Sequence, residues 1–233
     1  MLPITNNKNI NKHLNILNYL INTFNFKSYL EIGVYRGNNF VNINCENKES
    51  CDITDKYLQE DMQITYLMSS DDMFAQMDVN KKYDLIFIDG MHSEQNADRD
   101  IINSLKHLNP GGFVCLHDTV VYRRNAQVEY DEYSDRYGEW NGSTWKSITK
   151  LQNQNLEFYT IDNGDYGLTV IFYCPFYEQL YIPEYKSSLL YDYVFVNQDN
   201  NNIVFDSFTL QGRYIMHVVD IDDFIEICKN IKK

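Results

Sequence analysis

The sequence lacks the features by which several protein classes are recognised. Its five cysteines are odd in number and include no C-x-x-C pair, which argues against a disulfide framework and against a structural zinc site. No apolar run approaches the length of a membrane-spanning helix, and the Asn-rich N-terminus has no apolar signal-peptide core. We therefore expect a soluble, cytoplasmic protein without a membrane partner.

Basic residues are also scarce. Against 33 Asp and Glu the chain has only 20 Lys and Arg, giving a formal net charge of −13 over 233 residues. A protein that binds nucleic acid normally neutralises phosphates with a face rich in Lys and Arg. The charge therefore argues against a nucleic-acid partner, while the hydrophobic content of 44% is enough for the core of one α/β domain.

The most informative stretch is residues 28–37, SYLEIGVYRG. Tyr29, Leu30 and Ile32 indicate a buried parallel strand, with Glu31 near its carboxyl end. Gly33 and Gly37 then bracket a turn into a helix, where a ligand can lie against bare backbone. The pattern is E-x-G-x-x-x-G, so it lacks the glycine spacing of a dinucleotide-binding turn.

A second block, residues 83–119, reads YDLIFIDGMHSEQNADRDIINSLKHLNPGGFVCLHDT. Two continuous apolar runs, residues 85–88 and 113–116, are typical of strands buried on both faces. Apolar residues at helical spacing over residues 94–108 predict a helix between them, and we expect the Asn-Pro-Gly-Gly turn at 109–112 to end it. The block is a β-α-β unit with acids at both strand ends, the edge where open α/β sheets bind ligands.

Together the two blocks resemble class I S-adenosylmethionine-dependent methyltransferases. The similarity covers residues 29–171 and is greatest to a branch of small-molecule and sugar O-methyltransferases with FIDG-x-H after the fourth strand and HD after the fifth. The stretch WNGSTWKSITKL, residues 140–151, resembles a segment of methyltransferases encoded beside glycosyltransferases, which points to glycan modification. The family's Rossmann-like fold implies a mostly parallel sheet of seven strands with an antiparallel final strand.

The resemblance also implies where S-adenosylmethionine binds. In this family the acid at the end of the first strand interacts with the methionine amino group. An acid at the end of the second strand accepts hydrogen bonds from the ribose hydroxyls. The residues that match the cofactor site are Glu31, Gly33, Gly37, Asp52, Ser70, Asp89 and Gly90. Asp52 and Ser70 also have simpler interpretations, because either side chain suits a helix cap.

Four polar residues at neighbouring strand ends, Asp89, His92, His117 and Asp118, are the candidate catalytic group. One hypothesis is a divalent cation such as Mg²⁺ on Asp89 and Asp118, orienting an acceptor hydroxyl. The family's usual third ligand, an Asp or Asn beside the second acid, is replaced here by Thr119. The other hypothesis is metal-free catalysis, in which His92 or His117 removes the hydroxyl proton and Asp118 supports the imidazolium.

The remaining candidates lie in a stretch of low periodicity, residues 120–140, which we interpret as a lid. Tyr122, Arg123 and Trp140 are its candidate substrate contacts, because aromatic faces stack on sugars and an arginine pairs with a diphosphate. The bland alternative is that these side chains only anchor the loop.

We divide the chain into an N-terminal helical segment (1–26), a methyltransferase domain (27–174) and a C-terminal extension (175–233) that is either an appendage or a contact between subunits of a homo-oligomer. The sequence thus predicts an enzyme of the methyltransferase class that methylates a hydroxyl of a sugar, a nucleotide sugar or another sugar-containing small molecule. A methyltransferase acting on nucleic acid or protein, and a non-catalytic module that binds the cofactor, remain the alternatives.

Overall fold

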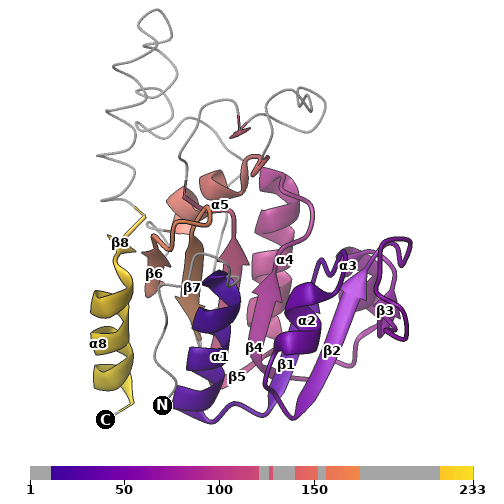
Figure 1. Cartoon of the computed structure of the whole chain (residues 1–233), viewed down its shortest axis with the longest axis horizontal. Coiled ribbons are helices and arrows are strands. Elements are labelled where there is room, and N and C mark those ends of the chain that lie inside the picture. Colours follow the sequence, from indigo (N-terminus) through magenta and orange to yellow (C-terminus); the bar gives the residue numbers. More distant parts are fainter. Residues whose placement is uncertain (1–11, 121–125, 128–139, 152–155, 174–215, 233) are drawn as a thin grey trace, which may run out of the picture.

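The computed structural model describes residues 12–120, 126–127, 140–151, 156–173 and 216–232 (Figure 1). The helices in these ranges are α1 (Lys12–Phe24), α2 (Asn38–Asn42), α3 (Ser70–Gln76), α4 (Glu94–Lys106), α5 (Thr144–Leu151) and α8 (Ile221–Ile231). The strands are β1 (Ser28–Ile32), β2 (Asn47–Asp52), β3 (Tyr66–Leu67), β4 (Tyr83–Ile88), β5 (Leu108–His117), β6 (Phe158–Ile161), β7 (Leu168–Phe172) and β8 (Val218–Val219).

These strands form one sheet in the order β3-β2-β1-β4-β5-β7-β6-β8. Strands β3, β2, β1, β4 and β5 pair in parallel, while β7 runs antiparallel to both β5 and β6. The carboxyl ends of the parallel strands therefore share one edge, at the top of the sheet in Figure 1. This is the Rossmann-like arrangement that the sequence predicted.

Within the described residues the sheet has eight strands, one more than the seven expected. The additional strand, β8, pairs in parallel with β6, with Thr160 opposite Val218 and Ile161 opposite Val219. A strand of two residues has too few positions to show any periodicity, so no sequence pattern could have predicted it.

Helices cover both faces of the sheet. One core cluster joins α3, α4 and α5 to one face, through residues such as Met73, Ile101 and Ile148. The other joins α1 and α8 to the opposite face, through residues such as Leu17 and Phe224. Figure 1 shows α1 and α4 on opposite sides of the strands, and the sheet between them supplies buried side chains to both clusters.

The segment between α4 and the apolar part of β5 differs from expectation. Helix α4 ends at Lys106, but Asn109 to Gly112 belong to β5 instead of forming a separate turn. The pairing of β4 and β5 is irregular there, because Tyr83 lies opposite Leu108 whereas Leu85 lies opposite Phe113. Pairing with a distant strand therefore decides the structure of this stretch.

Several expectations fall outside the described residues. They are most of the lid at 120–140, with Tyr122 and Arg123, and most of the C-terminal extension at 175–233. Among the helices that are described, none combines the length and apolarity required to cross a membrane.

Candidate active site

The turn after β1 packs directly against the end of β4. Gly33 has a φ of +85°, and a Cβ atom built on it would lie 2.1 Å from the Asp89 backbone oxygen. Only glycine tolerates both that conformation and that approach. The turn ends at Gly37, which has a φ of 78° and directly precedes the first residue of α2. Gly33 therefore places the start of the expected cofactor turn beside Asp89 and Gly90, whereas Gly37, at its end, lies against Met62.

Asp52, at the end of β2, holds this turn in place. Its Oδ2 accepts hydrogen bonds from the backbone N–H groups of Val34 (2.8 Å) and Tyr35 (2.9 Å), and its Oδ1 accepts one from Thr54 (3.1 Å). Tyr35 has a φ of 50°, a conformation that is uncommon for a residue other than glycine. A carboxylate that receives two turn amides fixes that conformation, and its role toward a ribose stays a prediction.

Glu31 is buried beneath the turn, with 1% of its surface exposed. Its Oε2 accepts hydrogen bonds from the Tyr29 hydroxyl (2.5 Å) and from Asn39 Nδ2 (2.7 Å). Burial raises the pKa of the Glu31 carboxyl to about 8, although these two hydrogen bonds act in the opposite direction. At neutral pH the group is therefore largely protonated and supports the turn from below.

Ser70 is the first residue of α3, and its neighbour Ser69 is the N-cap, accepting a 3.1 Å hydrogen bond from the Asp72 amide. Ser70 instead hydrogen-bonds the buried Asp100, whose pKa is raised by burial to about 6. Asp71 forms an ion pair with Arg99 at 3.0 Å. The N-cap of α3 is therefore Ser69, and not Ser70 as the sequence suggested.

The structure brings the four candidate catalytic residues together at the ends of β4 and β5. His92 Nδ1 lies 3.2 Å from Asp118 Oδ2, and His92 Nε2 lies 3.5 Å from Asp89 Oδ1. His117 Nδ1 lies 3.3 Å from Asp89 Oδ1 and 3.5 Å from Asp118 Oδ2. Two carboxylates and two imidazoles therefore alternate around one point, as expected for groups at neighbouring parallel strand ends.

The partners of His117 fix its protonation. Its Nδ1 faces the Asp89 and Asp118 carboxylates, and its Nε2 lies 2.9 Å from the backbone oxygen of Asp165. All these groups are acceptors only, so both nitrogens donate and the ring is an imidazolium. Burial alone would lower the pKa of His117, but the Asp118 and Asp89 carboxylates outweigh it and raise that pKa well above its usual value. His117 thus pairs with the Asp89 and Asp118 carboxylates, and neither of its ring nitrogens is free to accept a proton.

His92 has one nitrogen that is held firmly and one that is held less firmly. Its Nδ1 faces two acceptors, Asp118 Oδ2 and the Trp140 backbone oxygen at 3.3 Å, so this nitrogen carries a hydrogen. Its Nε2 is at the outer limit of a hydrogen bond with Asp89. Burial lowers the pKa of His92, but Asp89 and Asp118 more than offset this and raise it above the usual value. The two histidines that the sequence could not rank thus differ in geometry.

Asp89 is the more accessible of the two acids, with 27% of its side chain exposed against 7% for Asp118. Burial would raise the pKa of the Asp89 carboxyl, but His117 and His92 hold it well below its usual range. Asp89 is therefore ionised at neutral pH.

The segment 140–144 packs against one side of this cluster and contacts His92 and Asp118. The sequence had not predicted these contacts. The Ser143 amide donates to the His92 backbone oxygen (2.8 Å), and a Cβ atom on Gly142 would lie 1.9 Å from that same oxygen. Thr144 Oγ1 donates to the Asp118 backbone oxygen (2.6 Å). Asp118 itself has a φ of 57°, a strained conformation of the kind found at functional sites.

Trp140 is the one candidate substrate contact within the described residues. Its ring stacks on His92, with centroids 5.0 Å apart and an interplanar angle of 20°. The structure also adds two residues that carried no motif signal: Asp165, between β6 and β7, and His13, on α1, which contact each other and His117.

Comparisons with known proteins agree with this architecture. Residues 30–119 match the model of a family described as a methyltransferase domain. No curated protein sequence matches the chain. Among solved structures, the chain is similar to a putative caffeoyl-CoA O-methyltransferase from Staphylococcus aureus, with a TM-score of 0.53 and 17% identity over 70% of this chain and 83% of the other. It is also similar to cofactor-bound Rv0187 from MTB, with a TM-score of 0.51 and 10% identity over 72% of this chain and 83% of the other.

At these identities the structural likeness establishes the fold. The matched residues, 30–119, add the domain, since they run from β1 through the glycine turn to the acids that end β4 and β5. Residues 30–119 of the chain are therefore a methyltransferase domain, set within a Rossmann-like fold that the chain shares with solved methyltransferases.

Proposed function

We propose that the chain is an O-methyltransferase whose acceptor is a hydroxyl group of a sugar or a sugar-containing small molecule. The observation that carries this proposal is the His92–Asp118 pair, a histidine supported by a carboxylate beside the cofactor turn. Methyl transfer to a hydroxyl requires removal of one proton, and an imidazole held by an acid is suited to accept it.

The residues around the glycine turn fit the cofactor. Asn39 Oδ1, beside Glu31, is a buried acceptor without a hydrogen-bond partner among the described residues, and an ammonium donor would satisfy it. The ionised Asp89 carboxylate lies at the same edge and is more exposed than Glu31. We therefore assign attraction of the methionine ammonium to Asp89 and Asn39, with the buried Glu31 supporting Asn39.

His92 is our candidate for the proton acceptor. Bound S-adenosylmethionine would supply an electrophilic methyl group on a positively charged sulfur, and a positive charge near the cluster would favour the neutral form of His92. Asp118 and the Trp140 carbonyl keep the hydrogen on His92 Nδ1, which leaves Nε2 to take the hydroxyl proton. His117 holds Asp89 and Asp118 in position and takes no part in proton transfer.

A Mg²⁺ ion on Asp89 and Asp118 is the second route that the sequence suggested. Mg²⁺ prefers an octahedron of oxygen ligands, whereas imidazole nitrogens of His92 and His117 stand among these carboxylates. The donor set does not fit that ion, so we derive no step through it. Dialysis against EDTA tests this point, and full activity without added metal is the expected result.

Two observations support a sugar as the acceptor. The Trp140 ring lies against His92, and an aromatic face beside a catalytic pair suits the C–H face of a sugar. The clustered carboxylates offer acceptors for neighbouring hydroxyls. The net charge of −13 disfavours a nucleic-acid substrate.

A panel experiment tests the proposal. The protein is incubated with methyl-labelled S-adenosylmethionine and separate pools of nucleotide sugars, free sugars, catechols, caffeoyl-CoA, RNA and protein. Mass spectrometry then identifies the methylated product, with His107→Gln, at the opposite end of β5, as a matched variant expected to keep activity.

Each pool distinguishes one alternative. Label on a sugar hydroxyl supports the proposal, and label on a catechol or caffeoyl hydroxyl retains O-methylation but overturns the sugar assignment. Label on RNA or protein overturns the small-molecule acceptor. Cofactor binding without transfer to any pool favours the non-catalytic module.

A further inference from the structure

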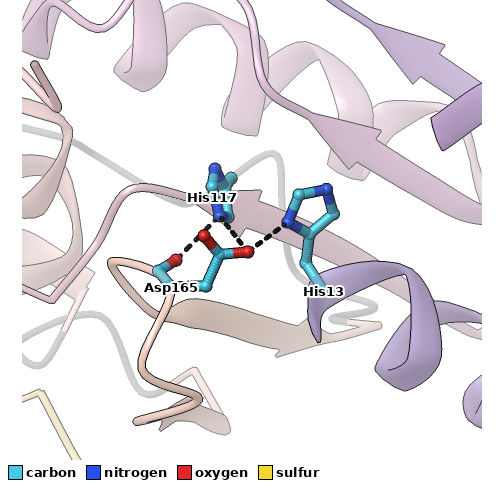
Figure 2. A group of neighbouring side chains, drawn as sticks. All are labelled: His13, His117 and Asp165. Carbon is cyan, nitrogen blue, oxygen red and sulfur yellow. Dashed lines mark hydrogen bonds and ion pairs between the residues drawn. The ribbon is translucent and has the colours of Figure 1, made fainter. Parts of the chain in front are cut away.

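Three residues that are far apart in the sequence meet on the α1 side of the catalytic cluster. His13 comes from α1, His117 from the end of β5, and Asp165 from the turn between β6 and β7 (Figure 2). The Asp165 carboxylate lies between the two rings, with Oδ2 3.1 Å from His13 Nδ1 and 3.9 Å from His117 Nε2. One potential ligand atom from each residue lies within 4.8 Å of the other two.

We propose that His13, His117 and Asp165 form a binding site for a zinc-type divalent cation. Two imidazole nitrogens and one carboxylate are a ligand set that suits Zn²⁺ and similar borderline metals, in contrast to the oxygen-only sets of Mg²⁺ and Ca²⁺. A water molecule would complete four-coordination. The proposal does not depend on which acceptor the enzyme methylates.

The distances fit such an ion. Zn²⁺ with bonds of about 2.0–2.2 Å holds tetrahedral ligand atoms about 3.4 Å apart. The distances from Asp165 Oδ2 to the two imidazole nitrogens, 3.1 and 3.9 Å, lie on either side of that value. An ion at this position would replace the hydrogen bond that His117 Nε2 now donates to the Asp165 backbone oxygen (2.9 Å).

A second, independent feature is the carboxylate on the far side of His117. When Nε2 of His117 binds the metal, its Nδ1–H still donates to Asp89, 3.3 Å away. A metal-bound histidine almost always donates its other N–H to such an acceptor, which fixes the tautomer and the ring orientation. The metal takes the place of the Nε2 proton, so the contacts of His117 with the catalytic cluster persist.

The site is also held ready by its surroundings. His13 and His117 are buried, at 7% and 8% exposure, whereas 36% of the Asp165 side chain is exposed and gives access to an ion. The amides of Asp165 and Gly167 both donate to Asn163 Oδ1 (2.9 and 3.2 Å), which fixes the turn that carries Asp165. Ordering the ligands on binding therefore costs little entropy.

A second group of potential ligands, Asp89, His92 and Asp118, lies nearby. Its two carboxylates both face Nδ1 of His117, and one of them, Asp89, supplies the outer hydrogen bond described above. We therefore assign the ion to the first group. Binding there would fix α1 to the edge of the sheet that carries the active site.

The test uses the untagged full-length protein, freed of metal by chelation. Co²⁺ is titrated while its visible absorption is recorded, and Zn²⁺ is then added in competition. The wild type is expected to bind one equivalent with the intense absorption of four- or five-coordinate Co²⁺, which Zn²⁺ displaces. His13→Gln and Asp165→Asn should each lower the affinity at least about 100-fold, and Asp89→Asn about 10- to 100-fold.

Two controls make the result specific. His107→Gln removes a histidine outside both groups, and His92→Gln removes a ligand of the second group alone; both should bind as the wild type does. Circular dichroism spectra establish that the variants are folded. The absence of stoichiometric binding in the wild type would overturn the proposal, as would unchanged binding in His13→Gln or a loss confined to His92→Gln.

Discussion

Thr144 Oγ1 donates a 2.6 Å hydrogen bond to the backbone oxygen of Asp118, joining the first residue of α5 to the end of β5. Both residues are buried, at 2% and 5% exposure. Asp118 is held at a positive φ, so this bond stabilises a strained backbone position directly beneath the candidate catalytic carboxylate. Thr144 thereby positions the residue that supports the proposed base.

Thr144→Val keeps the shape of the side chain and removes that donor. We expect a loss of about 1–3 kcal/mol in the free energy of unfolding, because a buried carbonyl loses its partner, together with a lower kcat. Thr149→Val is the matched control, since Thr149 donates to a carbonyl within the same helix, Lys146, at 2.7 Å. Urea unfolding and initial rates measure both effects. Equal behaviour of the two variants would contradict the positioning role of Thr144.

His92 and His117 should give different phenotypes. His92→Gln removes the proton acceptor, so kcat should fall by about 10²- to 10⁴-fold with little change in cofactor affinity. His117→Gln removes a buried imidazolium between two carboxylates and should cost about 3–5 kcal/mol of stability. Rates with the acceptor found in the panel and thermal unfolding of both variants make the comparison. A His92→Gln enzyme with normal kcat would show that another group takes the proton.

The raised pKa of Glu31 should make the free energy of unfolding depend on pH. Its pKa rises from the ordinary 4.5 to about 8 in the folded protein. Between these values the folded state holds a proton that the unfolded state has lost, so this group's contribution to stability falls as the pH rises. The full difference corresponds to up to about 5 kcal/mol.

Glu31→Gln removes this titration and keeps an acceptor for Tyr29 and Asn39. The variant should therefore gain stability relative to the wild type as the pH rises from 5 to 9, measured by urea unfolding at each pH. Glu46→Gln changes an acid whose side chain is 69% exposed, and it serves as the control. A stability difference between Glu31→Gln and the wild type that does not vary with pH would refute the assigned cause.

Alanine substitutions at Gly33 and Gly111 distinguish the cost of backbone strain from the cost of a close contact. Their φ angles are nearly equal, +85° and +81°, but a Cβ on Gly33 meets the Asp89 oxygen at 2.1 Å, whereas nothing lies within 4 Å of one on Gly111. Gly111→Ala should cost about 1–2 kcal/mol from strain alone. Gly33→Ala should cost about 1–3 kcal/mol more, because the turn and the end of β4 must separate. Equal losses in unfolding experiments would show that the close contact has no energetic role.

The main sheet, and the meeting of the candidate site residues at one of its edges, could be predicted from local patterns. The continuous apolar runs of β4 and β5 indicate buried parallel strands, and the carboxyl ends of such strands meet at one edge. The convergence of Asp89 with Asp118 follows from those two facts. The glycine turn was also recognisable locally, because two spaced glycines after a strand indicate a turn that needs positive φ angles. Both Gly33 and Gly37 have positive φ in the structure.

What escaped prediction depends on contacts between distant residues. Asp165 and His13 meet His117 only because β7 returns beside β5 and α1 packs on that face. The Asn-Pro-Gly-Gly segment continues β5 because Tyr83 pairs with Leu108 on the other side of the irregularity. The choice of Ser69 over Ser70 as the cap is a shift of one residue, which two adjacent serines cannot resolve by pattern.

The central claim is that this chain binds S-adenosylmethionine on the turn between β1 and α2. Calorimetric titration of S-adenosylmethionine, and of its demethylated product, into the wild type and into Asp52→Ala tests it most directly. Because Asp52 holds the amides of Val34 and Tyr35, we predict saturable binding at one site in the wild type and at least about tenfold weaker binding in the variant. No heat of binding in the wild type, or equal affinities in the two proteins, would contradict the account.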